Sequence, residues 1–181
     1  MLEKEYKCLL TFDEYDRVKN HFEWDSAKEQ TNNYYTDDNG VFSKNRIMFR
    51  VREKDNRAVI QVKSRKNSDS ALQICEETEF PIDSVPQIIE NPEKYTGVKS
   101  GAARRIGAAV TLRRSKMWDD NTEICLDMTT YFDKHDYEIE IEYTAEDIPA
   151  ELKAELNRIG IVFSEPSKGK YSRFLDEYHA K

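Results

Sequence analysis

Cysteine and histidine are scarce in this chain of 181 residues, which contains three of each. The cysteines Cys8, Cys75 and Cys125 lie far apart and form no CxxC pair. An odd, unpatterned set of this kind is typical of reduced thiols in a cytosolic protein. The histidines show no metal-ligand spacing, which argues against a zinc site.

Long apolar runs are also missing. No stretch approaches the roughly 20 apolar residues that a membrane-spanning helix needs. Glu3, Lys4 and Glu5 interrupt any early apolar run that a signal peptide would require. We therefore expect a cytoplasmic protein without a membrane partner.

Positive charge is in deficit, since the formal net charge is −7 and the calculated pI is about 5.2. This balance argues against a general nucleic-acid binder, which is usually basic. It leaves room for a small anionic ligand in a locally positive cavity, because net charge says little about local potential. Charged residues make up 35% of the chain, above the ordinary quarter. An interior lined by charges would explain that excess, and so would a highly solvated surface.

The chain is long enough for one domain with a substantial core, and it shows no repeat, linker or low-complexity segment. We expect a single domain over residues 1–181. Alternating patterns and turn signals predict eight antiparallel strands, over residues 2–11, 29–36, 47–53, 58–65, 72–80, 106–117, 122–132 and 137–143. Helices are predicted after the capping residue Thr11, over 146–159 and over 167–179, with a short helical excursion from Asp83 to Tyr95 that Pro86 and Pro92 break.

Charged residues recur at every second position of these strand-like segments. Residues two apart on a strand point to the same face, and like charges side by side on a solvated face would repel one another. The sets are Glu3 with Glu5 and Lys7, Arg50 with Arg52, Lys63 with Arg65, Glu77 with Glu79, Arg113 with Ser115, and Glu138 with Glu140 and Glu142.

A closed sheet accounts for this pattern better than a solvated face does. Interior and exterior residues alternate along every barrel strand. Basic strands that face acidic strands could hold a polyanion together with the divalent cations that neutralise the acids. The predicted fold class is therefore α+β, an eight-stranded antiparallel β-barrel that forms a tunnel with helices packed outside.

The charged motifs, taken in order, resemble those of the CYTH superfamily, the triphosphate tunnel metalloenzymes. The first is an ExExK strand, Glu3-Lys4-Glu5-Tyr6-Lys7. The order and spacing look most like the small stand-alone CYTH proteins of Gram-positive bacteria. One departure is Tyr34-Tyr35-Thr36-Asp37, where family members commonly have Asp before Thr, so no role is carried over to that Asp. The other matching segments are residues 30–35, 49–53, 61–63, 126–127, 136–140 and 168–174.

The resemblance implies a divalent-metal-dependent hydrolase of inorganic triphosphate or nucleoside triphosphates, with Mg²⁺ or Mn²⁺ as cofactor. The implied catalytic residues are Glu3, Glu5, Lys7 and Glu140. The implied metal ligands are Glu3, Glu5, Asp127, Glu138 and Glu140, with Glu77 as a weaker candidate. The implied phosphate-binding residues are Lys7, Arg50, Arg52, Lys63, Arg113 and Lys170.

Two other functions stay open at this stage. One is a class IV-type adenylyl cyclase, which would need a nucleoside pocket at the tunnel mouth; Tyr34 and Tyr35 could stack a base but are expected to pack. The other is a non-enzymatic polyphosphate-binding module, which intact carboxylates disfavour. The substrate, the metal and a possible homodimer are not decided by the sequence.

Several side chains are assigned to the surface or left open. Glu53 and Glu142 are expected at the outer ends of strands, and Arg114 is expected to face outward if Arg113 faces inward. Which of Glu76, Glu77 and Glu79 enters the tunnel is undecided, because the register of that strand is uncertain.

Overall fold

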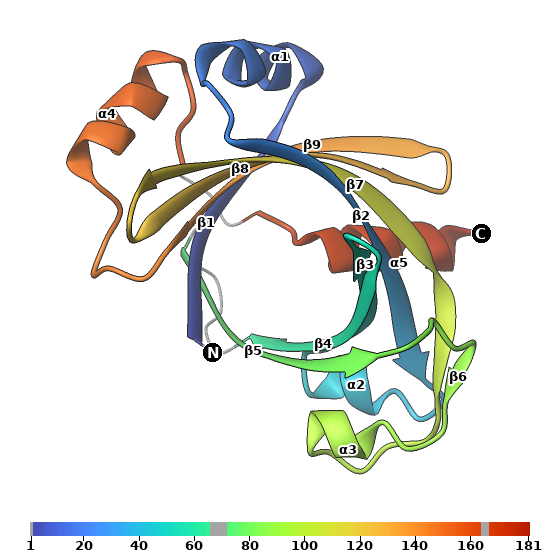
Figure 1. Cartoon of the computed structure of the whole chain (residues 1–181). Coiled ribbons are helices and arrows are strands. Elements are labelled where there is room, and N and C mark those ends of the chain that lie inside the picture. Colours follow the sequence, from blue (N-terminus) through green and yellow to red (C-terminus); the bar gives the residue numbers. More distant parts are fainter. Residues whose placement is uncertain (1, 66–71, 164–166) are drawn as a thin grey trace.

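The computed structural model describes residues 2–65, 72–163 and 167–181, with the backbone alone described for residues 2, 3 and 65. Eight antiparallel strands close into a barrel (Figure 1), which confirms the predicted α+β fold class. In order around the barrel they are β2 (Ser26–Asp37), β3 (Ile47–Lys54), β4 (Arg57–Arg65), β5 (Leu72–Ile82), β1 (Leu2–Leu10), β9 (Lys134–Tyr143), β8 (Thr122–Tyr131) and β7 (Ala103–Asp119). Pairing of β2 with β7 closes the ring.

Alternation along the strands separates an apolar outer layer from a charged interior. Helices α1 (Phe12–His21) and α4 (Ala150–Arg158) cover the outer face of β1, β8 and β9 (Figure 1). Val18 and Leu152 from these helices pack with Leu126 and Ile139 of the barrel in one buried cluster. The neighbours of these barrel residues in sequence, Asp127 and Glu138, therefore point to the other face.

Helix α1 begins where the sequence predicts. The Thr11 hydroxyl accepts a hydrogen bond from the Glu14 backbone N–H, and Glu14 accepts one from the Thr11 N–H at 2.7 Å. This reciprocal pair satisfies two backbone donors that the first turn would leave unpaired.

The segment from Asp83 to Tyr95 differs from the predicted helical excursion. It contains the two-residue strand β6 (Ile88–Ile89), which pairs with β7, and one helical turn, α3 (Glu93–Thr96). Pro86 and Pro92 explain the difference, since proline has no N–H and restrains the residue before it away from helical geometry. A second short helix, α2 (Val41–Lys44), was not expected. With α3 it covers an outer core around Phe42 and Phe49.

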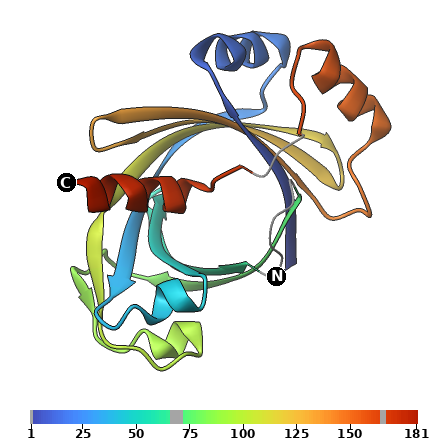
Figure 2. The same ribbon diagram turned by 180° about the vertical axis from the view of Figure 1, so that it is seen from behind.

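Helix α5 (Lys170–Ala180) lies across one end of the barrel, as the two opposite views show (Figures 1 and 2), and its first residues line the interior cavity. Phe174 packs there against Tyr34, Ala109 and Tyr131. Among the described residues, no helix has both the length and the apolar content needed to span a bilayer.

A bulge in β7 admits α5. The β2–β7 register shifts between Tyr34 and Tyr35, where Gly107 has a φ of +149°. A Cβ atom at this position would lie 2.8 Å from Cζ of Phe174. Glycine is therefore required both for the backbone conformation and for the close approach of the helix.

Gly107→Ala should destabilise the protein by about 2 kcal/mol or more, because the added methyl group either strains the bulge or displaces Phe174. Urea denaturation measures the change. Gly169→Ala is the matched control, since φ is −64° there and no atom lies within 4 Å of the added Cβ. Equal stability of the two variants would contradict this packing.

Candidate functional site

The barrel encloses a cavity of about 1050 Å³ that is lined mainly by charged and polar side chains. Eight of the sequence-predicted residues line it. They are Glu5, Lys7, Arg50, Arg52, Lys63, Arg113, Glu140 and Lys170. Asp127 and Glu138 are fully buried beside them. Of Glu3 only the backbone is described, opposite Cys75 of β5, so the roles expected of its side chain lie outside the described part of the chain.

Carboxylates from β8 and β9 gather around Arg113 of β7. Its Nε and Nη2 donate to the two oxygens of Asp127 at 2.9 and 2.7 Å, and its Nη1 donates to Glu142 at 2.9 Å. Nη2 also contacts Glu140. A bidentate pair of this kind fixes both partners in one plane.

Lys170 of α5 lies among the same carboxylates. Its ammonium is 2.9 Å from Asp127 and 2.7 Å from Glu140, and it also contacts Glu138. Arg173, one turn later, binds Glu138 at 2.8 Å and Asp136 at 2.6 Å. The start of α5 is thus tied to the acidic strands by ion pairs.

The ExExK strand extends this network toward β4 and β5. The Lys7 ammonium is 2.6 Å from Glu5 and 3.5 Å from Glu140. Lys63 is 3.5 Å from Glu77 and 4.0 Å from Glu5. The acids and bases predicted from separate segments therefore meet in one cavity.

Burial and ion pairing act on these carboxyl groups in opposite directions. Burial acts to raise the pKa of Glu140, but Lys170, Arg113 and Lys7 outweigh it and hold the pKa well below its usual value. The pKa values of Glu5 and Asp127 are lowered for the same reason. Burial raises the pKa of Glu138 and of Glu142.

The opposite wall, formed by β2, β3 and β4, is basic. Arg50 donates its Nε–H to Gln61 at 2.7 Å, and Arg52 donates its Nε–H to Asn32 at 3.1 Å. Within the described part of the chain, neither arginine has a carboxylate within 4 Å. Burial, with Arg50 and Arg113 nearby, lowers the pKa of Arg52 to about 9, which leaves it charged at neutral pH.

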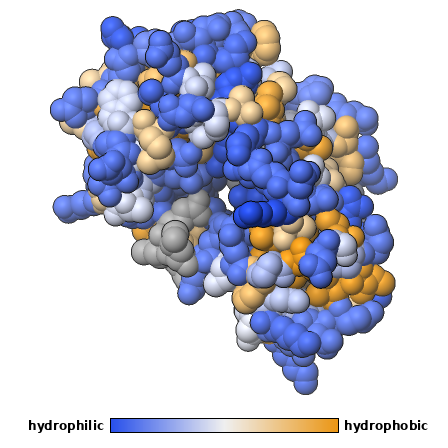
Figure 3. All heavy atoms as spheres, in the orientation of Figure 1, coloured by the Kyte–Doolittle hydropathy of each residue, from blue (hydrophilic) through white to orange (hydrophobic). Residues whose placement is uncertain are grey.

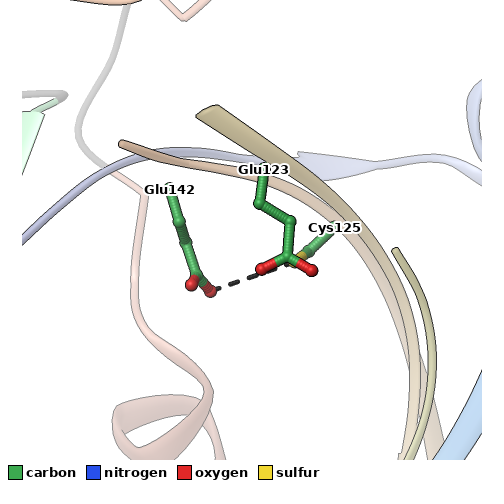
Figure 4. Close-up of side chains that lie close together, drawn as sticks. All are labelled: Glu123, Cys125 and Glu142. Carbon is green, nitrogen blue, oxygen red and sulfur yellow. Dashed lines mark hydrogen bonds between the residues drawn. The ribbon is translucent and has the colours of Figure 1, made fainter. Parts of the chain in front are cut away.

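Among the described residues, three groups of side chains bring potential metal-ligand atoms within 4.8 Å of one another. They are Glu5–Glu140–Glu142, Asp127–Glu138–Glu140 and Glu123–Cys125–Glu142. In the third group the Cys125 thiol is directed at Glu142, 4.0 Å away (Figure 4). Burial raises the pKa of this thiol well above its usual value, so it stays protonated and is a poor ligand. The two all-carboxylate groups fit a hard divalent cation better.

The structure corrects one assignment and decides others. The expectation that Glu142 lies at the surface is wrong: it follows Glu138 and Glu140 on the inner face of β9 and lines the cavity. The period-two pattern already contained this signal. Arg114 faces outward as expected, where it donates to the Tyr15 hydroxyl at 2.7 Å. In β5, Glu77 and Glu79 line the cavity.

The charge pattern contained no signal for Gln61 or Asn32 as partners of the two arginines, because neutral amides do not stand out in it. Cross-strand register places them, with Gln61 opposite Arg50 and Asn32 opposite Arg52. Tyr34 and Tyr35 pack in the two adjoining cores, as expected.

Comparisons with known proteins agree with this architecture. The CYTH domain family profile matches residues 1–174. HpAC1 from Hippeastrum, a protein named as an adenylyl cyclase whose dominant activity is that of a triphosphatase, has a similar structure. Its TM-score is 0.78 at 22% identity, with 97% of this chain and 96% of that chain covered. A protein from Bacillus halodurans that is named as an adenylate cyclase has a TM-score of 0.68 at 22% identity, with 94% of this chain and 95% of that chain covered.

A more distant structure is the capping-enzyme triphosphatase of Mimivirus. Its TM-score is 0.55 at 14% identity, with 87% of each chain covered. At such identities the structural likenesses establish the fold alone. No curated protein matches the chain in sequence.

The ion pairs of Asp127 predict how stability depends on pH. A carboxyl whose pKa is lowered by folding contributes stability above its unfolded pKa, and this is lost as the pH falls through the lowered value. The unfolded value is near 3.8. Between pH 6 and pH 3, wild-type protein should therefore lose more unfolding free energy than Asp127→Asn, as measured by urea denaturation.

Asp133→Asn is the surface control for this comparison, since the Asp133 side chain is 95% exposed. It should follow the wild-type pH dependence. An Asp127→Asn variant that loses as much stability as wild type would contradict the assigned role of the Asp127 ion pairs.

Proposed function

The chain belongs to the CYTH domain family, and on this premise we propose that it is a divalent-metal-dependent hydrolase of triphosphate-containing substrates. The observation that carries the proposal is the division of one cavity between two kinds of wall. Carboxylates gather on β1, β8 and β9, while Arg50 and Arg52 on β3 face them without an acidic partner among the described residues.

The basic wall provides the binding part of the proposed activity. A triphosphate carries several negative charges, and guanidinium groups bind phosphate oxygens two at a time. Arg50 and Arg52, with Lys63 on the neighbouring strand β4 and Lys7 on β1, would fix the chain of phosphates in one orientation. Positioning and charge neutralisation supply most of the catalysis in phosphoryl transfer.

The acidic wall provides the cation site. Glu5, Glu140 and Glu142, or Asp127, Glu138 and Glu140, offer the oxygen ligands that Mg²⁺ and Mn²⁺ prefer. A bound divalent ion would neutralise charge that develops on the phosphate oxygens. Lys170 contacts every carboxylate of the second group, so cation binding there requires its ammonium to move or to share those oxygens.

Glu142 is the carboxylate best suited to orient the attacking water. It lines the cavity and its side chain is 27% exposed, whereas Glu138 is fully buried. Burial raises the pKa of Glu142 above its usual value, and a more basic carboxylate is a better proton acceptor. No covalent intermediate with the protein is needed.

Product analysis separates hydrolysis from the other activities known for this fold. Phosphate release from inorganic triphosphate and from ATP, tested with Mg²⁺ and then with Mn²⁺, supports the proposal. Release of pyrophosphate with a cyclic nucleotide would identify a cyclase, and binding without turnover would identify a polyphosphate-binding module. Cytoplasmic location and a possible homodimer stay predictions.

Glu140→Gln should abolish metal-dependent phosphate release while the protein stays folded. Glu140 belongs to both all-carboxylate groups, and one oxygen ligand in each would lose its charge. Phosphate release with and without chelator, together with a thermal melt, measures the effect. The exposed Glu146→Gln is the control and should match wild type. Full activity in chelator would refute metal dependence.

Arg52→Lys should weaken triphosphate turnover by about tenfold, because an ammonium cannot bind two phosphate oxygens as a guanidinium does. Arg52→Ala should be worse. Arg114→Ala, at an arginine on the outer face, should be nearly silent. Steady-state hydrolysis rates compare the three variants, and equal small effects of Arg52→Ala and Arg114→Ala would show that Arg52 does not bind substrate.

A further inference from the structure

The two inward arginines of β3 are both held through Nε by a neutral amide from the neighbouring strand. Gln61 of β4 accepts from Arg50 at 2.7 Å, and Asn32 of β2 accepts from Arg52 at 3.1 Å. Both amides are buried, with 1% of each residue exposed. Each lies directly opposite its arginine in the strand register.

The hydrogen-bond partners of the Gln61 side-chain amide determine which way its oxygen and nitrogen point. Its Nε2 donates to Glu77 at 3.1 Å and also to Glu79. A carboxylate accepts only and a guanidinium donates only, so the oxygen of Gln61 must face Arg50 and its nitrogen must face the acids. Gln61 therefore stands between Arg50 and two carboxylates that could otherwise neutralise it.

The contrast with Arg113 shows what this arrangement preserves. Arg113 uses Nε, Nη1 and Nη2 on Asp127, Glu140 and Glu142. A guanidinium has five N–H donors, so bonding through Nε alone leaves the four Nη donors of Arg50 and of Arg52 for another acceptor. Because an amide carries no charge, neither arginine is neutralised by an ion pair within the described part of the chain.

We infer that Asn32 and Gln61 are positioning residues that orient Arg52 and Arg50 through Nε without neutralising them, so that their Nη edges are kept for the oxygens of a phosphate chain. This deepens the proposed function and rests on it. Gln61 does not line the cavity and can act only through Arg50. Asn32 does line the cavity, but with 1% of the residue exposed its main contact there is with Arg52.

Substitutions at Asn32 separate this role from a purely structural one. Asn32→Asp keeps the size and the acceptor but adds a charge that neutralises Arg52. Asn32→Ala removes the acceptor and adds no charge. If the inference is right, Asn32→Asp should weaken binding of inorganic triphosphate at least tenfold, and Asn32→Ala should weaken it less. If Asn32 only fills space, the order should be reversed, and Asn32→Asp should bind almost as well as wild type.

Asn33→Asp is a matched control one residue along β2. Asn33 accepts from Arg105 Nε at 2.9 Å and does not line the cavity. Asn33 also donates to Glu53 at 2.9 Å, so Asn33→Asp brings two carboxylates together as well as adding a charge beside Arg105. Because these contacts lie outside the cavity, the folded variant should keep a triphosphate affinity within about twofold of wild type. Gln61→Met, which removes the acceptor of Arg50, gives an independent second site and should weaken binding severalfold.

Isothermal titration with inorganic triphosphate, in EDTA and again with Ca²⁺, measures binding without relying on turnover, and thermal melts confirm that each variant is folded. Wild-type affinity in Asn32→Asp, or an equal loss in Asn33→Asp, would overturn the inference while leaving the hydrolase proposal intact. Wild-type protein that binds but releases no phosphate with Mg²⁺ or Mn²⁺ would overturn the hydrolase proposal alone. No binding by wild type in either condition would overturn both.

Discussion

Charged side chains inside a closed barrel must be compensated by one another or by a ligand, because removing a charge from water costs several kcal/mol. Among the described residues, the interior carboxylates of β8 and β9 meet this requirement through ion pairs, whereas Arg50 and Arg52 do not. Arg113 and Lys170 each bind three carboxylates, and these contacts lower the pKa of Glu140 and Asp127 against the effect of burial. Arg113 and Lys170 thus offset much of the negative charge of the acidic wall.

The basic wall is organised differently. Arg50 and Arg52 are held by amides, so their geometry is set while their charge is not cancelled. A site whose dipoles and charges are already oriented needs little reorganisation when an anion arrives. The asymmetry between the two walls, rather than the number of charges, makes the cavity suited to a phosphate chain with its cations.

The position of α5 links the charged interior to packing elsewhere in the barrel. Gly107 lets Phe174 approach the bulge in β7, which brings Lys170 to the acidic wall. The packing of one aromatic ring outside the charged region therefore helps to set the place of an ammonium inside it. A substitution that alters the packing of Phe174 should therefore also shift Lys170, because packed interiors transmit strain.

Much of the fold and part of the site were determined by the sequence itself. Side chains alternate along a strand, so the parity of Glu5, Lys7, Arg50 and Glu140 indicated an inner face, and the same rule includes Glu142, which had been assigned to the surface. The segment with Pro86 was misjudged because local pattern could not reveal its pairing with β7.

Only the tertiary structure decided which inner residues meet. Cross-strand register sets Gln61 opposite Arg50 and Asn32 opposite Arg52, and the β2–β7 pairing joins segments about 80 residues apart in the chain. The alternation of side chains between the two faces is a property of each strand's own backbone, so it can be predicted from the local sequence. Register and closure are set by contacts between distant segments, and no single strand contains them.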